Sequence, residues 1–313
     1  MKRTCLAIAA AALIIGLDGC SFKVTRPMLQ VVVSRSNIIR TDAVYADSLE
    51  KRLNVPYVDG GTSEQVFDIY YAAPEKRKDA VLIDIHGGFY VAGKHQNNRR
   101  FTSVFLKEGY DVVLLEYRLN NGKTDVSDEL ADCAAALDYL VAHAGELGIN
   151  KDRMFLTGDS AGGHLALYMA EGAADPAVPI RPKVFKPRGV MLNCPAYDFA
   201  SFAEMDVFTK SAFTWFIGPR YKDRQWLESV SPRTFIGSFT CPLFVSTCTR
   251  DFIRDRALLI KSDCDSLGRA IEFVDIESND SRVRHVHNVS SYDLPESKTV
   301  NDAMTAFMDN ILK

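Results

Sequence analysis

Residues 154–166 read MFLTGDSAGGHLA, and this stretch decides the fold of the 313-residue chain. Its apolar start is typical of a buried strand, and the run GHLALYMA is typical of a helix. Between them Gly158, Ser160 and Gly162 form a G-x-S-x-G pattern. A serine held in a strained strand-to-helix turn needs small neighbours, because larger side chains would collide with both elements. We therefore expect a nucleophile elbow; the alternative is a glycine loop around an idle serine.

Strand-like and helix-like segments alternate around this stretch. Strands are expected at 64–72, 79–88, 111–119, 153–160, 189–199, 241–249 and 270–276, and helices at 101–110, 127–148 and 295–312. The first strand alternates as a half-buried strand does, and Ser127 is expected to cap the second helix. This order predicts an α/β fold, a mostly parallel sheet covered by helices on both faces. Chemistry in such sheets gathers at the carboxyl ends of the strands.

A second glycine motif, HGGFY at residues 86–90, follows the strand expected at 79–88. The tetrahedral intermediate of acyl transfer carries negative charge on oxygen and needs fixed N–H donors. We expect these donors from an oxyanion hole made by Gly87, Gly88 and Phe89 together with Ala161, the residue after the serine. His86 is expected to anchor the loop rather than to transfer protons.

The acid and base that activate such a serine follow it in the order Asp, then His. Asp251 comes at the end of the strand expected at 241–249, with Asp255 as a competitor one helical turn later. His285 lies in the loop after the last strand, with His287 as its competitor. The remaining histidines are expected to lie on the surface or to pack behind the elbow: His95 and His143 in the first group, His164 in the second.

Composition narrows the class of protein. The chain is 47% hydrophobic and 25% charged with a formal net charge of −3, so nothing indicates nucleic-acid binding. Seven cysteines without a C-x-x-C pair argue against a disulfide framework and against a zinc cluster, although one disulfide stays open. His285 and His287 as a metal pair lack an evident third ligand. We expect no cofactor and no metal.

The first twenty residues differ from the rest. A basic start and an apolar core from Leu6 to Leu17 are typical of a secretory signal, since the core is too short to span a bilayer stably. The sequence LDGC at 17–20 resembles a bacterial lipobox, with Asp18 as an unusual residue and Cys20 as the lipidated one. A plain signal peptide is the alternative. We expect a signal at 1–19, a lead or cap segment at 20–60 and the main domain at 61–313, in the bacterial cell envelope.

Five stretches in this order resemble α/β-hydrolases of the hormone-sensitive-lipase-like group, which includes bacterial acetyl esterases and carboxylesterases: HGGFY (86–90), EYRL (116–119), DRMFLTGDSAGGHLALYMA (152–170), TRDFIRDRA (249–257) and HVHNV (285–289). The resemblance implies the α/β-hydrolase fold with a small cap insertion. It favours Asp251, the first Asp of D-x-x-x-D, as triad acid. It places the base at His285, with His287 where the family usually has Phe.

Two positions depart from the pattern of that group. Phe89 stands where the third glycine is usual, which is expected to tighten the acyl pocket, and YRLNNGKT replaces the usual continuation of EYRL, so substrate contacts there do not carry over. The segment 199–226 is rich in aromatic residues that could line an apolar pocket or pack an amphipathic helix: Phe199, Phe202, Phe208, Phe213, Trp215, Phe216, Tyr221 and Trp226.

The expected function is an exported serine hydrolase that cleaves carboxylic esters of small to medium acyl chains through a Ser160–His285–Asp251 triad and an acyl-enzyme. The expected partner is a small-molecule or glycan ester, with membrane contact only through a lipid anchor; the oligomeric state stays open. Two alternatives remain. One is a peptidase or amidase of the same fold, and the other is a catalytically silent binding protein.

Overall fold

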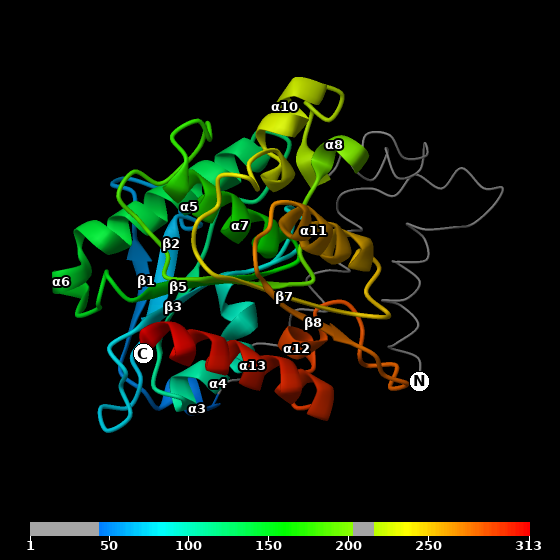
Figure 1. Cartoon of the computed structure of the whole chain (residues 1–313). Coiled ribbons are helices and arrows are strands. Elements are labelled where there is room, and N and C mark those ends of the chain that lie inside the picture. Colours follow the sequence, from blue (N-terminus) through cyan, green and yellow to red (C-terminus); the bar gives the residue numbers. More distant parts are fainter. Residues whose placement is uncertain (1–43, 203–215) are drawn as a thin grey trace, which may run out of the picture.

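The computed structural model describes residues 44–202 and 216–313 (Figure 1). Their core is one eight-stranded sheet with the order β1-β2-β4-β3-β5-β6-β7-β8. The strands are β1 (Lys51–Pro56), β2 (Val66–Tyr70), β3 (Val81–Ile85), β4 (Asp111–Leu115), β5 (Met154–Asp159), β6 (Val190–Asn193), β7 (Leu243–Cys248) and β8 (Glu272–Ile276). From β4 across to β8 every pairing is parallel, whereas β1 and β2 pair antiparallel at one end.

The sheet begins earlier in the chain than the sequence indicated. Strand β1 falls inside the segment 20–60 that was expected to be a lead or cap, so the sheet already includes residues before 61. Its register with β2 shifts between Arg52 and Val55, and Asn54 there has a φ of 53°. This irregularity removes the period of two that identifies a strand in a sequence.

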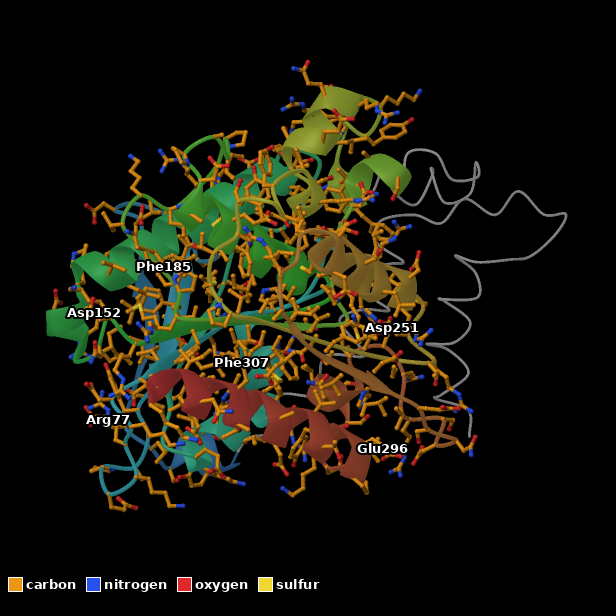
Figure 2. All side chains as sticks on the ribbon, viewed as in Figure 1. Arg77, Asp152, Phe185, Asp251, Glu296 and Phe307 are labelled. Carbon is orange, nitrogen blue, oxygen red and sulfur yellow. The ribbon has the colours of Figure 1, made fainter. Side chains whose placement is uncertain are left out.

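Helices cover both faces of the sheet (Figure 1). The larger core cluster joins one face to α5 (Val126–Ala142), α7 (Ala161–Ala174) and α11 (Arg254–Ser266). A second cluster joins the other face to α4 (Arg99–Lys107) and α13 (Pro295–Leu312). Figure 2 shows Phe307 of α13 on the sheet side, where its ring lies 5.9 Å from that of Phe244. Strand β2 is buried along its whole length rather than half-buried as expected, and its acidic residue Asp68 is buried with the rest.

Short helices complete the described ranges. They are α3 (Val44–Asp47), η2 (His95–Asn98), α6 (Ala144–Leu147), α8 (Phe199–Phe202), α10 (Arg224–Ser229), η3 (Pro232–Thr234) and α12 (His287–Ser290). The helix expected at 127–148 is divided into α5 and α6 near His143. The expectation that Ser127 caps it was wrong. Asp125, two residues earlier, is the N-cap: it accepts from the N–H of Ser127 and forms a capping box with Asp128.

Several expectations fall on residues outside the described ranges. The signal, the LDGC sequence with Cys20, and the aromatic residues between 203 and 215 all lie there. Within the described ranges all five cysteines are free thiols: Cys133, Cys194, Cys241, Cys248 and Cys264. Over the same ranges, every helix is too short or too polar to cross a bilayer.

Candidate active site

Ser160 sits in the turn between β5 and α7, in a backbone conformation that non-glycine residues rarely adopt. Its φ is +56° and its ψ is −116°, which is the strained turn expected of an elbow. The flanking glycines are required by contact. A Cβ on Gly158 would collide with the carbonyl of Gly162, and a Cβ on Gly162 would collide with the carbonyl of Ile85 in β3. The glycines therefore let α7 and the serine approach the neighbouring strand.

Three side chains from distant parts of the chain form one hydrogen-bonded row. Oγ of Ser160 lies 3.0 Å from Nε2 of His285, and Nδ1 of His285 lies 2.6 Å from Oδ1 of Asp251. A carboxylate only accepts, so Nδ1 carries the proton and Nε2 is free to accept from the serine hydroxyl. Ser160 and Asp251 are buried, and the side chain of His285 is 15% exposed. The structure thus brings together all three residues expected to form a triad.

Asp251 is held at the carboxyl end of β7, next to the start of α11 (Figure 2). Its Oδ2 accepts from Oγ1 of Thr247 at 2.9 Å, and its Oδ1 accepts from the N–H of Ile253 at 3.1 Å. Burial alone would raise the pKa of Asp251, but the His285 imidazole and these hydrogen bonds outweigh burial and lower it. The Asp251 carboxylate therefore stays negatively charged and can stabilise a protonated imidazole of His285.

The two competitors lie elsewhere. Asp255 is exposed and pairs with Arg256, at 3.3 Å. His287 is buried, and its Nδ1 lies 2.9 Å from Oγ of Ser297 in α13. Between the two histidines, Val286 has a left-handed backbone with a φ of +52°, which ends the loop and starts α12. This turn, rather than an extended segment, directs His287 into the protein. Burial lowers the pKa of His287 to about 4.

The loop after β3 presents N–H groups beside the elbow, but not the full set expected. The N–H of Gly87, which was expected to supply an oxyanion donor, donates to Oδ1 of Asp159 at 3.0 Å. The sequence does not indicate this hydrogen bond, because its acceptor is the side chain of Asp159, which directly precedes Ser160 and lies far from Gly87 along the chain. Within the described ranges, no hydrogen bond uses the N–H groups of Gly88, Phe89 or Ala161. These three remain available to a developing oxyanion.

A buried cluster of charged groups holds this loop from behind. Nε2 of His86 lies 3.0 Å from Oε1 of Glu116, and its Nδ1 lies 2.9 Å from the carbonyl of Gly87, so His86 is placed as the anchor that was expected. The expectation of a surface His95 was wrong. It is buried, with Nδ1 2.8 Å from Oε2 of Glu116 and Nε2 3.2 Å from Oδ2 of Asp68. One of these buried carboxylates lies on β2 and the other directly after β4, and a cation between them offsets the cost of burying their charges.

The pKa values in this cluster follow from the pairing. Burial would lower the pKa of His95, but the neighbouring carboxylates of Asp68 and Glu116 outweigh burial and raise it to about 9. Burial would raise the pKa of Glu116, but the imidazoles of His86 and His95 lower it to about 2. His164, by contrast, lies behind the elbow as expected and donates from Nε2 to the carbonyl of Val230 at 2.7 Å. Its burial lowers its pKa to about 4.

A row of aromatic side chains lies beside the imidazole of His285. The ring of Phe89 lies 4.9 Å from that of Phe216 and 5.9 Å from that of Phe252, and Phe252 lies 4.3 Å from the imidazole of His285. Phe252 is 45% exposed, so the row borders the opening to the site. Of the three, only Phe252 had not been singled out from the sequence; its position after Asp251 was the available signal.

Cys194 also lies beside Asp251 and His285, which no sequence motif indicated. Its Sγ, an Asp251 oxygen and a His285 nitrogen lie within 4.8 Å of one another. The pKa of the thiol is raised by burial and by Asp251. These donors fit a metal ion poorly, because the imidazole and the carboxylate are already bonded to each other and the sulfur is protonated.

Known proteins similar to this chain include lipases and esterases. Lipase 2 of Moraxella sp. (strain TA144) is 33% identical over 31% of this chain, and hormone-sensitive lipase of Bos taurus is 30% identical over 40% of it. The chain spans only 23% and 15% of the lengths of these relatives. Inhibited esterase B from Lactobacillus rhamnosis superimposes with a TM-score of 0.77 at 22% identity, covering 90% of this chain and 93% of that one.

The α/β-hydrolase fold and the resemblance to the hormone-sensitive-lipase-like group are thereby confirmed. The BD-FAE family model matches residues 67–255, which contain the loop after β3, the elbow serine and Asp251. Since this match covers more than half of the sequence, the chain belongs to the BD-FAE family.

Proposed function

We propose that this protein is a carboxylic ester hydrolase that works through an acyl-enzyme on Ser160. The observation that carries the proposal is the continuous row from Ser160 through His285 to Asp251, at 3.0 and 2.6 Å, beside unused N–H groups. A serine hydroxyl becomes a nucleophile when an adjacent base takes its proton, and this row supplies such a base. The names of the similar proteins, lipases and esterases, also support ester substrates.

The first half of the reaction forms the acyl-enzyme. Oγ of Ser160 attacks the ester carbonyl while its proton passes to Nε2 of His285. The imidazolium that forms is stabilised by Asp251, whose lowered pKa keeps it negative. The carbonyl oxygen becomes an oxyanion opposite the N–H groups of Gly88, Phe89 and Ala161. The tetrahedral intermediate then collapses, and His285 gives its proton to the leaving alcohol.

The second half of the reaction repeats these steps with water. His285 takes a proton from a water molecule, which attacks the acyl carbon, and the same N–H groups receive the second oxyanion. Collapse returns the proton to Oγ of Ser160 and releases the carboxylic acid. Each step uses only the groups already described, so the proposed reaction is complete with the residues of this chain.

Small to medium acyl chains fit the aromatic row best. Phe89 replaces the small residue that the oxyanion loop of this group usually carries, and its ring is wedged between those of Phe216 and Phe252. A ring held on both sides cannot easily move to admit a long chain. We infer that the row limits acyl length, while leaving the alcohol side, a small molecule or a glycan, undetermined.

One assay series separates this function from its rivals. The protein is offered p-nitrophenyl esters from acetate to laurate, an acetylated glycan and matched p-nitroanilides, with Ser160→Ala as the blank. We expect turnover of the short esters, a fall with chain length and little anilide cleavage. Faster anilide than ester cleavage would instead favour an amidase. Binding of these esters without turnover would favour a silent binding protein.

We further propose export with a lipid anchor on Cys20. The proposal rests on the apolar core and the sequence LDGC at its end. Mass spectrometry of the mature N-terminus should find diacylglycerol on Cys20. An unmodified N-terminus at another residue would reject the anchor and leave export standing, whereas retention of residues 1–19 would reject both.

A further inference from the structure

Two residues with left-handed backbones meet behind the triad. Cys194, directly after β6, has a φ of +48°, and Val286, directly after His285, has a φ of +52°. Neither is glycine, and a left-handed conformation is especially unfavourable for a β-branched residue such as valine. Both are buried, at 1% and 4% exposure. Strain of this kind persists only where neighbouring groups hold the backbone in place.

The N–H and the carbonyl of Val286 are held from different sides: the carbonyl accepts from the N–H groups of Val289 and Ser290 in α12, and the N–H is held by the cysteine sulfur. The N–H of Val286 donates to Sγ of Cys194 at 3.2 Å. Cys194 itself is fixed, since its own N–H donates to the carbonyl of Ser246 in β7 at 2.8 Å. The Cys194 sulfur, which accepts from the loop of His285, is therefore fixed at the carboxyl end of β6 within the central sheet.

The same strand end also holds the nucleophile. The carbonyl of Asn193 accepts from the N–H of Ser160 at 2.9 Å, and its Oδ1 accepts from Nδ2 of Asn288 in α12 at 2.7 Å. Two consecutive residues therefore tie Ser160 on one side and the loop of His285 on the other. The distance between Oγ and Nε2 depends on both ties.

We propose that Cys194 is a positioning residue for His285. Its sulfur accepts from Val286, keeps the left-handed turn closed and thereby sets the reach of Nε2 to Oγ of Ser160. The thiol suits this place because burial and Asp251 keep it protonated, so it brings no second negative charge beside the carboxylate. The inference rests on the proposed function, in which this reach governs the reaction rate.

Four variants test the role. Cys194→Ala removes the acceptor, Cys194→Gly removes it while also relieving the backbone strain at this position, and Cys194→Ser keeps a smaller acceptor. Cys264→Ala is the matched control, a buried thiol on α11. We expect kcat for p-nitrophenyl acetate to fall roughly 10- to 100-fold in the Ala and Gly variants, with KM changed by less than about twofold. Ser should recover most of the rate, and the control should keep it.

A signal that does not need turnover completes the test. The Nδ1–H proton of His285, shared with Asp251, is followed by NMR at low temperature in each variant. We expect it to shift or broaden in Cys194→Ala and Cys194→Gly and to return in Cys194→Ser. Each kcat is divided by the concentration of active sites titrated with a phosphonate, so that unfolded molecules are not counted. If Cys194→Ala does not fold, Cys194→Gly takes its place in the test.

The outcomes separate the two proposals. An unchanged proton signal and unchanged kcat in the Ala and Gly variants would overturn the positioning role, as would a Ser variant as slow as Ala. If wild type lacks ester turnover, the proposed function fails, and the proton signal alone then decides whether Cys194 positions His285.

Discussion

Oδ1 of Asp251 lies 2.6 Å from Nδ1 of His285, while Asp255, four residues later, points to solvent and pairs with Arg256. A sequence pattern with two aspartates therefore resolves into one that faces the imidazole and one that does not. The position at the end of β7 decides, because that end of the strand lies beside the loop after β8.

Replacing each aspartate by asparagine tests this assignment. Asp251→Asn is expected to lower kcat by about 10⁴, because an amide N–H facing Nδ1 favours the tautomer with its proton on Nε2. Asp255→Asn should keep the rate within about twofold, as for other exposed changes. Steady-state kinetics on p-nitrophenyl acetate measure both. An equal loss in the two variants would contradict the assignment.

The two histidines make a second matched pair. His285→Ala is expected to lose activity by several orders of magnitude, since no other base lies within 3.0 Å of Oγ of Ser160 in the described ranges. His287→Phe should keep most of the activity, because that side chain is buried against α13 and bonds to Ser297. The His287→Phe substitution should instead lower the free energy of unfolding by about 1 kcal/mol, because it removes this hydrogen bond. A reversal of the two phenotypes would move the base to His287.

Phe89 is expected to control acyl length. Phe89→Gly removes the middle ring of the aromatic row, so the ratio of octanoate to acetate kcat/KM should rise about tenfold or more. Leu267→Ala, an exposed apolar side chain at the end of α11, is the control and should leave the ratio unchanged. A p-nitrophenyl ester series gives the ratio directly. If long chains gain nothing, the acyl group lies elsewhere.

Stability should depend on pH through the buried cluster of His86, His95, Glu116 and Asp68 behind the loop that follows β3. The pKa of His95 is raised from 6.5 to about 9, so its stabilising contribution is fully present below about pH 6.5 and is lost as the pH rises through 9. Glu116, lowered from 4.5 to about 2, contributes above about pH 4.5 and loses its contribution as the pH falls through 2. The cluster is therefore strongest between about pH 4.5 and 6.5.

Urea unfolding of wild type and His95→Gln at pH 6 and pH 9.5 measures this dependence. We expect the free-energy difference between the two proteins to be larger at pH 6, by up to about 3 kcal/mol. A His95→Gln penalty independent of pH would mean that His95 is not held as a cation.

Features marked by a short run of neighbouring residues could be predicted from the sequence, whereas contacts between residues far apart in the chain could not. Ser160, Asp251 and His285 could be picked out because each follows a strand in a fixed order. The buried place of His95 could not, because it depends on one carboxylate from β2 and another directly after β4. Gly87 could not be separated from Gly88 for a similar reason, since the acceptor of its N–H is the side chain of Asp159. Long-range polar pairs leave no periodic pattern in a sequence.

The most direct measurement of the central claim is peptide mapping after treatment with a fluorophosphonate. The account predicts one adduct, on the peptide that contains Ser160, together with loss of ester turnover. Ser160→Ala should not be labelled and should keep only the rate that the oxyanion donors give, about 10³- to 10⁴-fold over water in related triads. An adduct on another residue, or near-wild-type turnover by Ser160→Ala, would contradict it.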